Sequence, residues 1–289
     1  MSTLAPSVPV ADPVAPAAAV APRRPSRRGA LAALTRRRLA LSARTPREVL
    51  VPLLAPVLFA VVIAPALDSL GPRVPGVDYM SFAAVGIAGL LIPLNCMFSG
   101  IGVIVDREGG ARRDLLAAPV PRPLLVAANL AVALAVTGLQ VAVLIGAVVL
   151  RGAELDVRAT GVAWFVAAAA LLTVAMYGVA ETLANRLPSV EEFTGAIPPI
   201  AIVPFFFAGS LFPITALPAW LTGVARVLPL THALALMRYG LLGTTTGLED
   251  IWGHHDPTAM AALSLAVVAA FAAALAAVAV RTFRRAAVR

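Results

Sequence analysis

The chain has 289 residues, of which 60% are hydrophobic and 13% are charged, and its mean hydropathy is +0.90. This composition is more apolar than that of soluble domains and indicates an integral membrane protein. The formal net charge of +8 depends on 23 arginines, because the sequence contains no lysine. A Walker A phosphate loop requires lysine and is therefore excluded. The single cysteine, Cys96, excludes an internal disulfide and a zinc cluster.

The N-terminal segment divides into a tail and a predicted surface helix. Residues 1–28 are rich in alanine, proline and arginine, which cannot form a hydrophobic core, so we expect a disordered cytoplasmic tail. Gly29–Ser42 is predicted to be an amphipathic helix lying on the membrane. Its lipid-facing residues would be Ala30, Leu31, Leu34 and Leu41. Arg38 falls on the same face, so the pattern is imperfect. Residues 29–289 are expected to form one membrane domain.

Six apolar runs in this domain are long enough to cross a bilayer, which takes about 20 helical residues. They are Val49–Leu67, Phe82–Ile104, Leu124–Leu150, Gly161–Ala180, Gly195–Leu211 and Thr258–Val280. An even number of spans places both termini on one side of the membrane. Eighteen of the 23 arginines then share that side. Because arginine accumulates in cytoplasmic segments, both termini are predicted to be cytoplasmic, and the fold class is all-α integral membrane.

Local patterns predict two further features. Ser189 and Glu192 have the spacing of a capping box, so a helix should start there, and Pro198, Pro199 and Pro204 should kink the fifth span. Before the last span, two apolar helices too short to span are separated by Pro229. They are Ala219–Val227 and Thr231–Leu242, and we expect them to be re-entrant or interfacial.

The spans contain almost no ionisable residue, which argues against transport driven by an ion within the membrane. Glu181 is the nearest case, and two interpretations remain open: an interfacial charge, or a role in substrate passage. Asn95, Asn129 and Gln140 are interpreted as interhelical hydrogen-bonding groups that could still contact a polar substrate. No catalytic or metal motif is present, so the chain is predicted not to be an enzyme, and lone His232 is assigned to packing or capping.

A charged island, VDREGGARRDLLAAPVPRP, occupies Val105–Pro123 between the second and third runs. It contains four arginines and three acidic residues. Since it connects two apolar runs, it must lie in water at a membrane face, and its arginines indicate the cytoplasmic face. The arginines flank apolar segments and have no interleaved aromatic residues, so we expect no nucleic-acid partner.

Two stretches resemble the signatures of type-two ABC exporter permeases. Asp106–Arg122, DREGGARRDLLAAPVPR, is similar to that family's Glu-Arg-Glu-x-Gly-Thr … Leu-Leu-x-x-Pro-Val pattern, with Asp106 in place of glutamate and Ala111 in place of threonine. The second stretch comprises Phe207–Pro213 (FAGSLFP), LPAW at 217–220, LPLT at 228–231 and Arg238. The resemblance covers roughly Arg44–Arg284. The lysine-free, alanine-rich composition resembles the actinobacterial, daunorubicin-resistance-type branch.

The resemblance implies a permease that binds no cofactor and works as a homodimer with a separate ATPase subunit, which binds ATP and magnesium. The charged island would be its coupling helix, in which Asp106, Arg107 and Glu108 contact the ATPase or lock the helix ends and Leu115 and Leu116 pack into the ATPase. The full coupling set is Asp106, Arg107, Glu108, Gly110, Arg112, Arg113, Leu115, Leu116 and Pro119. The outer signature, or gate, is Phe207, Gly209, Pro213, Pro218, Trp220, Pro229 and Arg238.

By this resemblance the chain exports a hydrophobic small molecule, either a drug or a natural product, across the bacterial plasma membrane, and would contribute to efflux and antibiotic resistance. Two alternatives stay open. One is export of a lipid or a lipid-linked glycan by the same machinery. The other is a structural or lipid-handling membrane protein that has no ATPase partner.

Overall fold

The computed structural model describes residues 26–44, 78–117, 120–153, 155–253 and 255–286, with five isolated positions between 54 and 66. The predicted first span, Val49–Leu67, lies largely outside the described residues. So does the predicted tail, residues 1–28, apart from its last residues, which begin the first helix.

The part of the chain that the structure describes is all-helical. Its elements are α1 (Arg27–Arg44), α4 (Tyr79–Glu108), α5 (Ala111–Ala117), α6 (Arg122–Leu150), α7 (Ala159–Ala184), α8 (Val190–Gly195), the π-helical turn η2 (Pro198–Ile202), α9 (Val203–Phe207), the 3-10 turn η3 (Ile214–Ala216), α10 (Ala219–Ala225), α11 (Pro229–Leu242), α12 (Thr246–Trp252) and α13 (Pro257–Ala286). The helix α12 was not predicted.

Five helical segments within the described residues are long and apolar enough to cross a membrane. They are α4, α6, α7, the α8–α9 segment Val190–Phe207, and α13. These five segments correspond to the predicted second to sixth spans. Helices α10 and α11 pass the same test as a pair but are bent by 78° relative to each other. They form either a broken sixth span or a re-entrant loop. The prediction of an all-helical membrane protein is therefore confirmed.

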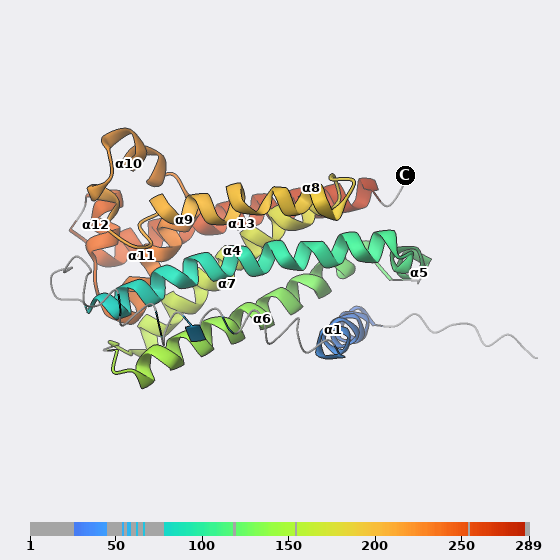
Figure 1. The fold of residues 1–289 in the computed structure, drawn as a ribbon, viewed down its shortest axis with the longest axis horizontal. Coiled ribbons are helices and arrows are strands. Elements are labelled where there is room, and N and C mark those ends of the chain that lie inside the picture. Colours follow the sequence, from blue (N-terminus) through green and yellow to red (C-terminus); the bar gives the residue numbers. More distant parts are fainter. Residues whose placement is uncertain are drawn as a thin grey trace, which may run out of the picture.

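The long helices run along one axis, and the two ends of the bundle differ (Figure 1). One end of the bundle contains the last residues of α4 and α13, the short helix α5, and the first residues of α6 and α8. We call it the arginine-rich end. At the opposite end, the distal end, α4 begins and α10, α11 and α12 gather. The largest buried cluster is formed by α4, α6, α7, α11 and α13.

Close backbone packing at the distal end depends on glycine. A Cβ atom on Gly161 of α7 would overlap the carbonyl oxygen of Gly240 on α11, and the reverse is also true. Small residues allow such contact between apolar helices, where van der Waals packing replaces the hydrophobic effect as the main attraction. α11 can therefore sit deep in the bundle, and most of its residues are buried.

The predicted capping and kinks of the fifth span are present. The Ser189 hydroxyl accepts a hydrogen bond from the backbone N–H of Glu192 at 3.2 Å and so caps α8. The segment then passes through α8, η2 and α9, because Pro198, Pro199 and Pro204 each lack the N–H that a regular helix needs.

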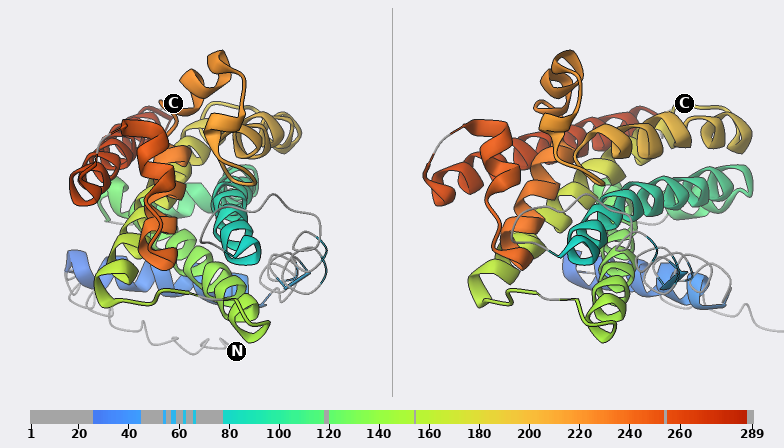
Figure 2. Two further views of the ribbon diagram at one scale, coloured as in Figure 1. Left: turned by 90° about the vertical axis from the view of Figure 1, so that its left-hand side faces the viewer. Right: turned by 60° about the vertical axis from the view of Figure 1, so that its left-hand side comes forward.

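Helix α1 crosses the bundle near the arginine-rich end, since it is seen nearly end-on in Figure 1 and lengthwise in the left view of Figure 2. Its placement agrees with a surface helix, but its orientation corrects the prediction. Ala30 is buried and Leu34 packs against a buried cluster, so both face the protein instead of lipid. Leu39 is exposed on the opposite face. The cause is that α1 packs its apolar residues against α6.

Candidate functional site

The charged island is mostly helical. α4 continues to Glu108, so Asp106, Arg107 and Glu108 form its last turn instead of a loop. The chain then turns at Gly110, whose φ of +78° is a left-handed conformation that favours glycine. Seven residues, Ala111–Ala117, form α5, which corresponds to the predicted coupling helix. The side chains of Arg113 and Leu116, and all of Pro119, lie outside the described residues.

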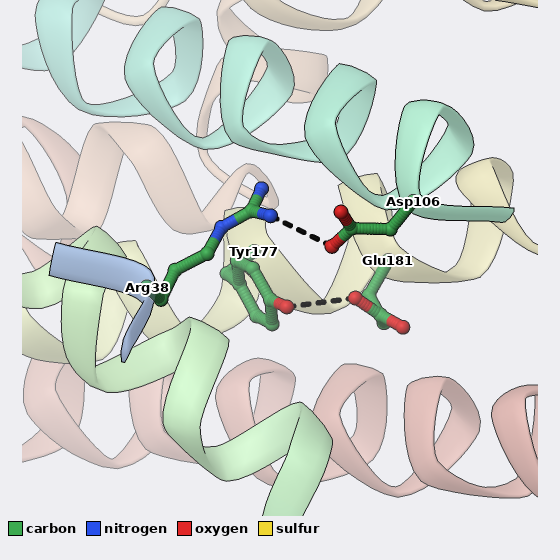
Figure 3. Close-up of polar contacts among 4 residues, drawn as sticks. All are labelled: Arg38, Asp106, Tyr177 and Glu181. Atoms are coloured by element: carbon green, nitrogen blue, oxygen red, sulfur yellow. Dashed lines mark hydrogen bonds and ion pairs between the residues drawn. The ribbon is translucent and has the colours of Figure 1, made fainter. Parts of the chain in front are cut away.

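Asp106 joins α4 to α1. Its carboxylate accepts a hydrogen bond from the Arg38 guanidinium at 2.7 Å, and the two side chains are 25% and 19% exposed (Figure 3). Gly102 makes room for this contact, because a Cβ atom there would overlap the Arg38 guanidinium. Arg38, which interrupts the apolar face of α1, is thus the residue through which α1 binds α4.

Arg107 joins α4 to the end of α7. Its guanidinium donates one hydrogen bond to the carbonyl of Ala184 at 2.9 Å and another to the carbonyl of Pro188 at 2.8 Å. The last carbonyls of a helix lack intrahelical partners, and a cation is favourable near them. Arg107 therefore locks the turn between α7 and α8 onto α4. Glu108, the next residue, is exposed.

The helix α5 rests on the bundle through one face. The Arg112 guanidinium lies over the ring of Phe283 in α13, with 4.9 Å from the guanidinium carbon to the ring centroid. Leu115 packs against the buried cluster that contains Leu125 and Phe283. Leu115, which was predicted to face the ATPase, thus points toward the permease itself.

Glu181 lies at the arginine-rich end of α7, but it is completely buried. Its carboxyl accepts a hydrogen bond from the Tyr177 hydroxyl at 2.7 Å (Figure 3). It accepts another from the Asn185 side-chain amide at 2.9 Å. Arg112 and Arg38 act on Glu181 electrostatically, and Asn129 interacts with the Tyr177 hydroxyl. Glu181 is therefore a buried group close to the partly exposed Arg38–Asp106 pair, and not an exposed interfacial charge.

Of the other polar residues of the suggested substrate path, Asn95 joins two helices. The Asn95 side-chain amide on α4 donates to the Thr137 hydroxyl on α6 at 2.7 Å, which is the predicted interhelical role. Gln140, one turn further along α6, is buried, and its side-chain oxygen has no partner among the described residues. Of the four suggested residues, the structure brings Asn129 and Glu181 into one network.

At the distal end, Arg238 fastens the outer signature to α4. It is 5% exposed and donates to the carbonyls of Gly209 at 2.5 Å, Ser210 at 2.7 Å and Phe82 at 3.3 Å. Its guanidinium also lies 3.4 Å from the centroid of the Phe82 ring. Such a cation–π contact adds to the three hydrogen bonds. The first residues of the signature and its last arginine, 29 positions apart, thus form one unit.

Two glycines permit this arrangement. Gly209 has φ +84°, and Gly86 on α4 provides the space that the Ser210 carbonyl enters, since a Cβ atom there would overlap that oxygen.

Of the remaining signature residues, Pro213 borders the same cavity as Arg238, while Pro218 and Pro229 stand at the starts of α10 and α11. Phe207 ends α9 and is half-buried, and Trp220 is 72% exposed and takes no part in the cluster.

His232 also has a structural role, as predicted. A carbonyl can only accept, so its Nε2–H donates to the Arg226 carbonyl at the end of α10, at 2.9 Å. Its Nδ1 then accepts from the Ser264 hydroxyl, at 3.2 Å. The Trp252 indole N–H donates to the same hydroxyl at 2.8 Å, which ties α12 and α13 to this junction.

Sequence reasoning missed Arg38 and Tyr177 as members of the site. Arg38 gave a signal, because a charged residue on an apolar helix face needs a partner. Tyr177 gave none beyond its position one helical turn before Glu181.

Comparisons with known proteins show the family of the chain. A family model described as ABC-2 type transporter matches residues 29–242. The chain is also 25% identical over 199 residues to the inner membrane transport permease YadH of Escherichia coli K12 and to that of Shigella flexneri. Each match covers 66% of this chain and 74% of the relative. The chain therefore belongs to the ABC-2 type transporter family, as a membrane-spanning permease subunit that is not itself an enzyme.

Proposed function

We propose that this chain is the membrane part of an ATP-driven exporter that moves a hydrophobic small molecule, a drug or a natural product, out of the cell. Two copies would pair with separate ATPase subunits, which bind ATP and magnesium. The proposal rests on the family match and on the helix α5 at the arginine-rich end. The relative named as an inner membrane permease supports the cytoplasmic membrane as its location, with the arginine-rich end on the cytoplasmic side.

The observation that carries the proposal is that three consecutive residues at the end of α4 have different contacts. Asp106 binds α1 and Arg107 binds the end of α7, whereas Glu108 is exposed beside the turn into α5. An ATPase that binds Glu108 and the outward face of α5 would therefore move α4 directly. It would move α1 through Arg38 and α7 through Arg107.

The character of the spans supports a hydrophobic substrate. Among the described residues of the membrane domain, the fully or nearly fully buried charges are Glu181 and Arg238, and both are engaged by the protein. A lipid or a lipid-linked glycan remains the second candidate, because a membrane-facing apolar path suits an acyl chain as well.

Docking of the ATPase is tested by a pull-down from detergent. The tagged chain is co-expressed with candidate ATPase subunits from its own genome, as wild type, as Glu108→Ala, and with Asp106–Asp114 replaced by Gly/Ser. Glu191→Ala serves as control, since Glu191 is also an exposed acid at this end, on α8. We expect wild type and the control to recover an ATPase and the other two to lose it. Undiminished recovery by both island variants would contradict the proposal.

The substrate class is tested by efflux from cells that express both subunits. Cellular accumulation of a panel of fluorescent hydrophobic compounds should fall with the wild-type permease and not with Glu108→Ala. Unchanged accumulation of every compound, together with altered exposure of lipid or glycan at the cell surface, would favour the second candidate.

A further inference from the structure

A cleft at the arginine-rich end lies between α1, α4, α5, α6 and α13. Its polar lining consists of Arg37 and Arg38 from α1, Asp106 from α4, Arg112 from α5 and Asn129 from α6. Leucine, valine and alanine side chains and the Phe283 ring form the rest of its wall. The cleft is therefore cationic at its polar side and apolar elsewhere.

The positive charge of this cleft is not balanced by its own acid. Asp106 is bound to Arg38, which leaves Arg37 and Arg112 without a carboxylate within ion-pair distance among the described residues. Arg37 is exposed, so water solvates it. Arg112 is different, because its Nη2 is buried and has no hydrogen-bond partner in the described part of the chain.

An unsatisfied buried donor on a cation is unfavourable. The position of Arg112 shows this cost, since burial lowers the pKa of its guanidinium more than nearby Glu181 raises it. The Phe283 ring covers a face of the guanidinium and leaves its N–H edge to find an acceptor. An anion in the cleft would supply that acceptor and the missing negative charge.

The location of the cleft selects the kind of anion. α1 crosses the bundle near its arginine-rich end, as a helix at a membrane surface does (Figures 1 and 2). Leu34, Arg37 and Arg38 of α1 line the cleft. Guanidinium groups bind phosphate oxygens in a planar, two-pronged geometry, and basic pockets at the cytoplasmic ends of membrane helices suit lipid headgroups. The leucine and phenylalanine wall suits the glycerol and upper acyl region of the same molecule.

We propose that this cleft binds the phosphate of an anionic phospholipid, with Arg37 and Arg112 as its donors. The bound lipid would connect α1 to α5 and so fix the position of the coupling helix. Binding requires only this chain and the bilayer, so the inference does not depend on the proposed export of a small molecule or on ATPase docking.

Binding is tested with the purified full-length chain in neutral detergent. Its unfolding temperature is measured in mixed micelles with phosphatidylglycerol, with phosphatidylcholine, and with inorganic phosphate alone. Native mass spectrometry counts the phosphatidylglycerol molecules retained per chain. We expect phosphatidylglycerol to raise the unfolding temperature and one molecule to be retained, and neither phosphatidylcholine nor inorganic phosphate to reproduce the shift.

The site is tested with the double variant Arg37→Gln/Arg112→Gln. Its matched control is Arg284→Gln/Arg285→Gln, which removes the same charge from exposed positions at the same end, on α13. The control should keep the shift and the bound lipid, and the cleft variant should lose both. Arg37→Gln alone changes an exposed residue, so it folds regardless of the buried site and should retain lipid more weakly than wild type.

Three results would overturn the inference. The first is an equal shift with phosphatidylcholine, which would show a general lipid effect. The second is an equal shift with inorganic phosphate, which would assign the site to free phosphate. The third is retention of phosphatidylglycerol by both cleft variants at the wild-type level, which would place the lipid elsewhere.

Discussion

The two ends of this permease use arginine in different ways. At the distal end, Arg238 of α11 is buried, donates to three backbone carbonyls and lies over the Phe82 ring, so α11, α4 and the Gly209–Ser210 turn are fixed together. At the arginine-rich end, Arg38 and Asp106 form a partly exposed ion pair between two helices, and Arg107 binds carbonyls at the edge of the bundle.

The difference concerns how easily each junction can change. Separating Arg238 from its carbonyls would leave several buried groups without partners, which is costly. Arg38 and Asp106 keep 19% and 25% of their side-chain surface exposed, so separating them costs less than separating Arg238 from its carbonyls. The distal end is therefore built as a rigid junction and the arginine-rich end as an adjustable one, where an ATPase could move helices without unfolding them.

The comparison predicts its largest effect at Arg238. Replacing it in Arg238→Met leaves three carbonyls without their donor, and we expect a loss of about 3–5 kcal/mol in unfolding free energy. Arg238→Lys should lie between this variant and wild type, because a lysine cannot make the forked contact. The measurement is denaturant unfolding in detergent.

A matched control for this prediction is Arg158→Gln. Arg158 pairs with Asp156 on the surface of the same end, and its side chain is 73% exposed. Its loss should change stability by no more than about 1 kcal/mol. A destabilisation of Arg238→Met no larger than that of the control would refute the rigid junction.

A smaller loss of unfolding free energy is expected when the Gly209–Ser210 turn is displaced from α4. In Gly86→Ala the new methyl group overlaps the Ser210 carbonyl, and overpacking of this kind costs about 1–3 kcal/mol. Gly138→Ala on α6 is the control, since no atom lies within 4 Å of its added Cβ. That variant should be neutral or more stable, because alanine favours a helix. Equal unfolding temperatures for the two variants would contradict the close contact.

The buried network behind the ion pair should give the next effect. Tyr177→Phe removes the hydroxyl that donates to Glu181, and we expect a loss of about 1–2 kcal/mol. The effect should be non-additive with Glu181→Gln, since both variants break the same contact. A double variant whose loss equals the sum of the single losses would show that the two residues act separately.

Sequence reasoning predicted the second to sixth spans because long apolar runs are a property of the chain itself. It also predicted the cap at Ser189 and the break at Pro229, which are local. It failed on the direction in which side chains point. Leu115 was predicted to face a partner and Leu34 to face lipid, but both pack inward, because a half-apolar helix does not reveal which neighbour covers it.

The site was predictable only in part for the same reason. Arg238 and Gly209 were singled out together by a motif. The carbonyl contacts that join them also depend on Gly86, which precedes Gly209 by 123 positions in the sequence. The Arg38–Asp106 pair connects residues 68 positions apart and follows no local pattern. Such contacts are set by the docking of α1 on the bundle.

The smallest change in stability is expected at this pair, and it carries the sharpest test of the comparison. Arg38→Gln and Asp106→Asn should each lower the unfolding free energy by about 1 kcal/mol, with a coupling between them of up to about 1 kcal/mol, because the pair is only partly exposed and lies at the upper end of the range for surface pairs. The adjustable junction nevertheless requires the pair to transmit motion between α4 and α1. Transport with the ATPase should therefore fall in both single variants and recover in the charge-reversed Arg38→Asp/Asp106→Arg chain. If instead the single variants unfold as readily as Arg238→Met, the arginine-rich end is as rigid as the distal end, and the motion must pass through α4 and α7 alone.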